Sequence, residues 1–148
     1  MYFEDFEPGK LIQVGFRMVT ARNLDAFIEL TGLDNPIFLS DQGARAAGHP
    51  ARLVPGPFQL SLAMGLCQQS GLFDRVVAVA QFNELRFLKP VHPGDTLTMT
   101  ALPLEKRPTR DSSRGLVILR YEISNQNGEP VLTADGTYLF LTRSEDRL

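Results

Sequence analysis

Two residue types that can move protons near neutral pH occur in the first third of the chain. Asp34 lies in the stretch TGLDNPIFLSD, residues 31–41, directly before an Asn-Pro pair, and His49 follows in the stretch AAGHPARLVPG. A carboxylate or an imidazole can take a proton from water and return one to a carbon atom. Asp34 and His49 are residues of these two stretches that could carry such proton transfers.

Each candidate also has a purely structural interpretation. An aspartate beside Asn-Pro often forms a turn by accepting backbone N–H groups, which would suit Asp34. His49, within Gly-His-Pro, fits an exposed loop, and His92, within PVHPGD, fits a turn between strands. Two separated histidines and the lone Cys67 give no metal-ligand spacing, so we expect no metal site.

Length and composition indicate one globular domain spanning residues 1–148. The 148 residues are 43% hydrophobic and 22% charged, which favours a packed core over disorder. A net charge of −2 gives no indication of nucleic-acid or membrane-surface binding. The acidic, aromatic start MYFEDFEPGK is unlike a signal peptide, and no apolar run reaches the length of a membrane span. With a single cysteine, the chain is expected to be soluble and cytoplasmic.

The first half of the chain predicts one strand followed by helices. KLIQVGFRMVT alternates as a strand does, and residues 21–31 place apolar side chains on one helical face between Thr20 as N-cap and Gly32 as C-cap. Ser40 or Asp41 can cap a second short helix. The stretch PGPFQLSLAMGLCQQSGLF predicts a central helix that is apolar nearly all round, and such a helix is expected to be buried.

The second half predicts four strands joined by turns. The runs VVAVAQFNELRFLKP, DTLTMTALPLEKR, GLVILRYEISNQN and PVLTADGTYLFLT are separated by turn-forming residues, and NQNG is a strong hairpin signal. We therefore expect an α+β fold of the hot-dog kind, in which an antiparallel sheet of about five strands wraps around the central helix.

These segments together resemble the MaoC-like, or (R)-specific enoyl-CoA hydratase, family of hot-dog proteins. YFEDFEPGK is similar to the opening of that family, and RLVPGPFQLSLAMG to its entry into the central helix. RFLKPVHPGDTL and SNQNGEPVLTADGTYLF look like its strand signatures. AFIELTGLDNPIF lies where the family carries a catalytic loop with the pattern DxNPxH.

The resemblance implies a hydratase or dehydratase acting on an acyl thioester of coenzyme A or of acyl carrier protein, without a cofactor of its own. In the family, the Asp–His pair of DxNPxH handles water and protons, and a backbone N–H at the start of the central helix holds the thioester oxygen. When the two patterns are aligned on Asn35-Pro36, Leu33 occupies the acid position and Phe38 the histidine position. Asp34 or His49 would have to replace them. The expected substrate-binding residues are Asn35, Pro36, Phe38, Gly56 and Phe58.

Two other functions stay open. The same pattern is similar to the substrate-holding half of heteromeric dehydratases, where Leu33 and Phe38 would line an acyl tunnel and a partner subunit would supply the chemistry. A hot-dog thioesterase would need a carboxylate near the central helix, where Glu84 is the candidate and Arg86 its expected ion-pair partner. Because a hot-dog sheet leaves an exposed edge strand, we expect a homodimer or a heterodimer with another hot-dog subunit.

The loop EKRPTRDSSRG carries several cations, which would suit either a clamp for coenzyme-A phosphates or a solvated hairpin tip. These are Lys106, Arg107, Arg110 and Arg114.

Overall fold

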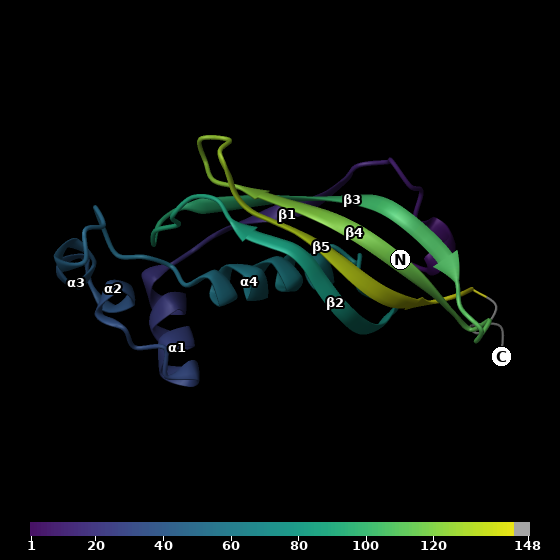
Figure 1. The fold of residues 1–148 in the computed structure, drawn as a ribbon, viewed down its shortest axis with the longest axis horizontal. Helices are drawn as coiled ribbons and strands as arrows, with labels where there is room; N and C mark the ends of the chain where they lie inside the picture. The colour runs from purple at the N-terminus through teal and green to yellow at the C-terminus, as the bar shows by residue number, and fades with distance from the viewer. Residues whose placement is uncertain (144–148) are drawn as a thin grey trace.

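A computed structural model describes residues 1–143 and shows one curved sheet with helices at one end and against one face (Figure 1). The elements in chain order are η1 (Phe3–Asp5), β1 (Ile12–Met18), α1 (Ala21–Thr31), α2 (Pro36–Leu39), α3 (Asp41–Ala46), α4 (Gly56–Gln69), β2 (Val76–Phe87), β3 (Thr96–Pro108), β4 (Arg114–Ser124) and β5 (Pro130–Leu141). The two longer helices and the five strands that the sequence patterns predict are all present among the described residues.

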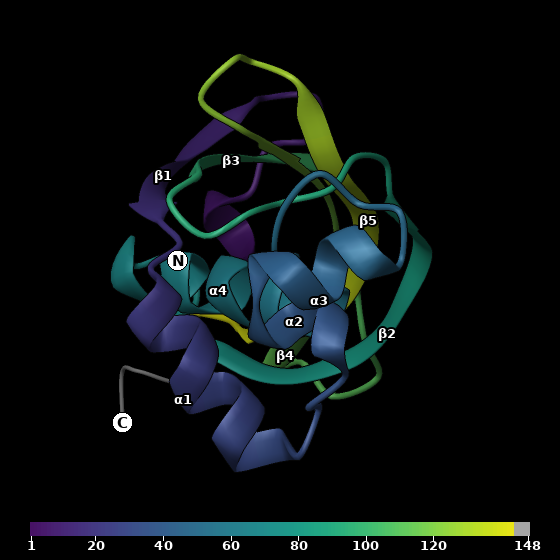
Figure 2. The same ribbon diagram turned by 90° about the vertical axis from the view of Figure 1, so that its left-hand side faces the viewer.

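The five strands form a single antiparallel sheet in the order β1-β3-β4-β5-β2. The hairpin between β4 and β5 closes where NQNG predicts it, with Gly128 at φ 73°. The sheet curls around α4, which lies along its concave side (Figure 2). This arrangement is the hot-dog fold, and the expected α+β class is confirmed.

The core lies between α4 and the concave face of the sheet. Strand β4 alternates buried and exposed side chains, and its inward residues Val117, Leu119 and Tyr121 are fully buried. Leu66 and Cys67 of α4 face the same core. Because successive side chains of a strand point to opposite faces, this alternation fixes which face of the sheet receives the helix.

The central helix is buried on the side facing the sheet but not all round. Its buried residues include Phe58, Gln59 and Leu62, whereas Pro57, Ser61 and Gln68 remain exposed. The expectation of a helix buried on every side is therefore met only in part. The sheet covers one side of the helix, and the remaining stripe is open in the single chain.

Helices α1, α2 and α3 gather at one end of the molecule, beyond the start of α4 (Figure 2). The side chain of Thr20 caps α1 by accepting a hydrogen bond from the Asn23 N–H, and Gly32 ends it at φ 72°. Ser40, not Asp41, caps α3. The sequence patterns did not predict α2, which begins at Pro36 with Asn35 as its N-cap.

Strand β2 forms one edge of the sheet and is exposed along nearly its whole length. Its pairing with β5 is interrupted between Asn83 and Arg86, where Glu84 adopts φ 52°. A side chain there is strained, and this conformation produces a bulge in the edge strand. Among the described residues, no helix is long and apolar enough to cross a membrane.

Candidate functional site

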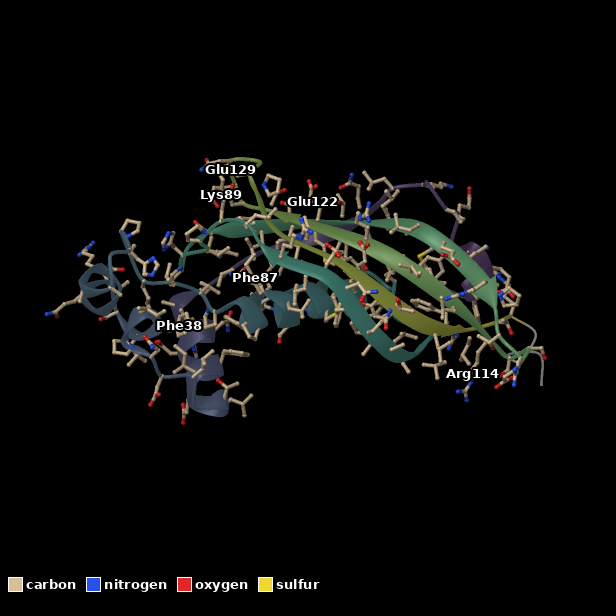
Figure 3. All side chains as sticks on the ribbon, in the orientation of Figure 1. Phe38, Phe87, Lys89, Arg114, Glu122 and Glu129 are labelled. Carbon is tan, nitrogen blue, oxygen red and sulfur yellow. The ribbon has the colours of Figure 1, made fainter. Side chains whose placement is uncertain are left out.

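A cavity of about 520 Å³ lies where α2, the start of α4 and the segment after β2 meet. We call it the site cavity. Figure 3 shows Phe38 and Phe87 at this end of the molecule. The residues that line it are Ile37, Phe38, His49, Leu53, Val54, Gly56, Pro57, Gln59, Phe87, Leu88, Lys89, Pro90 and Val91. Most of these side chains are apolar, which suits an apolar ligand.

Local hydrogen bonds hold the loop that carries Phe38 over the cavity. The Asn35 side chain accepts from the Ile37 N–H at 3.1 Å and so starts α2. The Leu53 N–H donates to the Ile37 carbonyl at 3.0 Å. Arg52 donates from Nε to the Phe38 carbonyl at 2.6 Å and forms an ion pair with Asp25 of α1. Phe38 is thus fixed by contacts from two other segments.

The expected catalytic residue Asp34 does not lie in the site cavity. Its side chain is exposed in the loop between α1 and α2, and among the described residues it is not part of the cavity lining. Its backbone N–H donates to the Gly32 carbonyl at 2.9 Å, which continues the turn that ends α1. Leu33 is likewise exposed and outside the lining. The structural interpretation of Asp34 as a turn residue fits this position.

His49 and Phe38 do line the same cavity. His49 is half-buried and is tied to α3 through its backbone N–H, which donates to the Ala44 carbonyl at 3.0 Å. It is the only imidazole in the lining among residues 1–143. His92 lies elsewhere: its Nδ1 is 2.7 Å from the Arg52 carbonyl, in the turn position that its sequence predicts.

The start of α4 leaves one free donor at the cavity wall. The N–H groups of Phe58 and Gln59 both donate to the Pro55 carbonyl, and Pro57 has no N–H. No acceptor within residues 1–143 takes the Gly56 N–H. Because helix starts carry partial positive charge, this N–H can stabilise a negatively charged oxygen.

Gly56 also has a steric role that the sequence did not predict. The Phe87 ring rests on it so closely that a Cβ at position 56 would lie 2.5 Å from the ring Cζ. Phe87 is nevertheless 49% exposed. Because Gly56 and Phe87 come from separate elements, no local sequence signal could have predicted their contact.

Three of the expected substrate-binding residues have structural roles instead. Phe58 is 6% exposed and stacks on Phe27 with ring centroids 4.6 Å apart, so it belongs to the core and not to the cavity lining. Asn35 and Pro36 form the first turn of α2 and shape the loop from outside the cavity. Of the expected substrate-binding residues, Phe38 and Gly56 lie in the cavity lining, whereas Asn35, Pro36 and Phe58 do not.

Among residues 1–143, Lys89 is the only lysine or arginine in the cavity lining. It forms an ion pair with Glu129 in the β4–β5 turn, and Figure 3 shows the two residues together above Phe87. The hydrogen bond from Lys89 lowers the pKa of the Glu129 carboxyl. Sequence reasoning missed Lys89, although its position at the end of a predicted strand, before Pro90, could have indicated the rim of a site.

The basic loop after β3 lies far from the site cavity. Figure 3 shows Arg114 at the opposite end of the sheet from Phe38. Lys106 donates to the carbonyls of Phe3 and Glu4, and its ammonium lies 5.0 Å from the centroid of the Phe3 ring. The phosphate clamp is therefore not formed at this chain's own cavity.

Glu84 pairs with Arg86 at 2.5 Å on the exposed edge strand, as its sequence position predicts. It is not in the lining of the site cavity. This position does not support a thioesterase carboxylate beside the central helix.

Comparisons with known proteins show which family this chain is similar to. A family model described as "MaoC like domain" matches residues 10–125. Mesaconyl-CoA hydratase of Cereibacter sphaeroides is 31% identical over 133 residues, which are 89% of this chain and 38% of that protein. The chain thus spans well under half the length of this relative.

Solved structures show the same fold. The X-ray structure of a monoamine oxidase regulatory protein from Archaeoglobus fulgius matches with a TM-score of 0.86 and 32% identity, over 96% of this chain and 95% of that one. The HadBC (3R-hydroxyacyl-ACP dehydratase) complex of Mycobacterium tuberculosis matches with a TM-score of 0.74 and 24% identity, over 89% of this chain and 96% of that one. The second likeness is one of fold alone.

Proposed function

Because the chain belongs to the MaoC-like domain family, we propose that its site cavity binds an acyl thioester of coenzyme A or of acyl carrier protein. The chain would do so as part of a hydratase or dehydratase reaction. The apolar lining supports this proposal, since an acyl chain gains roughly 0.8 kcal/mol for each methylene that it buries. The Gly56 N–H would hold the thioester oxygen.

Hydration of an enoyl thioester adds the water oxygen to the β-carbon and a proton to the α-carbon, with negative charge developing on the thioester oxygen. A base must take a proton from the water, and donors must stabilise the oxygen. The Gly56 N–H can serve the second need. For the base, the cavity offers no carboxylate. Asp34 lies outside it, and no acidic side chain of residues 1–143 is part of its lining.

The observation that carries the proposal is Phe38 in the cavity at the position of the family histidine. An aromatic ring can shape an acyl tunnel but cannot transfer a proton. We therefore assign this chain the binding role, and a catalytically complete hot-dog partner supplies the acid and base. The structural likeness to the HadBC complex is compatible with such a pairing.

Isothermal titration calorimetry of purified protein with a short saturated acyl-CoA and with free coenzyme A tests the binding role. We expect the acyl-CoA to bind at least tenfold more tightly than coenzyme A. Gly56→Ala should weaken acyl-CoA binding, because the new methyl group would displace Phe87. Gly65→Ala is the matched control on the same helix, since nothing lies within 4 Å of its Cβ position. Equal affinity for acyl-CoA and coenzyme A would overturn the proposal.

A self-sufficient hydratase is the second candidate, and the position of His49 in the cavity lining favours it. A neutral His49 would take the proton from water and return it to the α-carbon as the imidazolium. In that case His49→Gln would abolish enoyl-CoA hydration while leaving acyl-CoA affinity unchanged. Hydration that persists in His49→Gln would exclude this mechanism.

A further inference from the structure

Gln59 stands out on the central helix because it is polar and only 3% exposed. Its Nε2 donates to the Val54 carbonyl at 3.2 Å, whereas its Oε1 has no hydrogen-bond partner within the described chain. Leaving a buried polar atom unpaired costs about 1–3 kcal/mol. An apolar residue would pack at this position without that cost, so the amide calls for an explanation.

Gln59 is the residue that two cavities of the described chain share. On one side it lines the site cavity. On the other it lines an inner cavity of about 10 Å³, enclosed between α4 and strands β1, β3 and β4. The other residues of the inner cavity are Arg17, Leu62, Ala63, Leu66, Leu97 and Ile123. A space of that size holds at most about one water molecule, so a ligand in the site cavity cannot extend into it.

The hydrogen bond to Val54 holds the Gln59 side chain in place between the two cavities. Val54 directly precedes Pro55 at the start of α4, and its own N–H donates to the Val91 carbonyl at 2.8 Å. The Gln59 side chain is therefore held at Nε2 by a backbone segment that is itself fixed. A flexible side chain of the same length without this bond could swing aside.

We infer that Gln59 is the floor of the acyl site and restricts this chain to short acyl groups. The inference rests on the proposed function, in which the thioester oxygen lies at the Gly56 N–H. Gln59 follows Gly56 by three residues, a rise of about 4.5 Å along the helix axis. An acyl group that starts at Gly56 therefore meets the Gln59 side chain after a few carbons.

Calorimetry with saturated acyl-CoAs from acetyl to octanoyl tests this inference. For the wild type, affinity rises with chain length and then stops rising or falls once the chain reaches Gln59. In Gln59→Ala the side chain no longer separates the cavities, so the rise continues by about fourfold for each further methylene that becomes buried. Gln59→Asn, which shortens the side chain by one methylene and keeps the amide, should extend the limit by about one methylene if Gln59→Ala does not fold.

Two control variants separate the effect of side-chain length at position 59 from the general effect of a substitution in α4. Gln59→Met keeps the length of the side chain but removes the hydrogen bond to Val54, so its limit should lie between that of the wild type and that of Gln59→Ala. Gln68→Ala, on the exposed part of the same helix and away from both cavities, should leave the whole series unchanged.

The outcomes distinguish this inference from the proposed function. A wild type that binds acyl-CoAs, with Gln59→Ala and Gln59→Asn showing the same length limit as the wild type, overturns the role of Gln59 alone. A wild type that binds every acyl-CoA no better than coenzyme A overturns both.

Discussion

Phe38 lies in the cavity lining, at the position where the family pattern has a histidine. The loop around it is complete, because Asn35 caps α2 and Arg52 binds the Phe38 carbonyl. The backbone therefore holds position 38 at the cavity. The ring fills that place with apolar surface, and Asp34 lies in the loop between α1 and α2, outside the cavity lining.

Cys67 gives a prediction at the same scale. Burial raises the pKa of its thiol to about 12, with the sulfur 4.0 Å from the Met99 sulfur. Since the folded state keeps this proton over a pH range in which the unfolded chain loses it, the free energy of unfolding falls as pH rises above about 9. The slope approaches about 1.4 kcal/mol per pH unit once the thiol of the unfolded chain is fully ionised.

Urea unfolding of the wild type and Cys67→Ala between pH 8 and about 10 measures this effect, since the tyrosines, which titrate near pH 10 in the unfolded chain, are common to both proteins. The variant should lose less stability over this range than the wild type. Parallel curves would show that the thiol is not buried as described.

At the scale of elements, α2 and α3 are joined by a contact that only glycine allows. A Cβ at Gly43 would overlap the Pro36 carbonyl, which lies against α3. Gly43→Ala should therefore separate the two helices and destabilise the protein by about 1–3 kcal/mol. Because this movement also shifts Phe38, acyl-CoA affinity should fall as well. Denaturant unfolding beside Gly65→Ala checks the first effect, and equal midpoints would contradict it.

The elements that the sequence predicted correctly have local signals. Thr20 and Gly32 bound α1 because capping depends on neighbouring residues, and the long β-strands alternate within themselves. The short α2 was missed because Asn35-Pro36 fits a turn as well as a helix start. The contact of Phe87 with Gly56 could not be predicted, since it joins elements that are distant in sequence. For the same reason the sequence placed Phe58 at the site when its ring packs on Phe27.

At the scale of the molecule, β2 leaves an unpaired edge beside the site. Its side chains include the exposed Val77, Val79, Leu85 and Phe87, and exposed apolar strand edges favour pairing with another chain. The last of these residues lines the site cavity. We therefore expect a second hot-dog subunit, a copy of this chain or its catalytic partner, to pair along β2.

Val79→Asp should weaken this pairing, because it places a charge in the middle of the apolar edge. Sedimentation velocity would then show a shift toward monomer. Phe16→Asp is the matched control, since Phe16 is 73% exposed on β1 at the opposite edge of the sheet. Dissociation by Phe16→Asp and not by Val79→Asp would assign the interface to the other edge.

The measurement that tests the central claim most directly is hydration of a short conjugated enoyl-CoA by the purified chain alone, followed by its ultraviolet absorbance. The same preparation is first shown to bind a saturated acyl-CoA, so that an absence of activity cannot be due to unfolded protein. We predict no loss of absorbance above the uncatalysed rate, because no carboxylate lines the cavity within residues 1–143. Steady turnover by the wild type that His49→Gln removes would contradict the account and assign the chemistry to this chain itself.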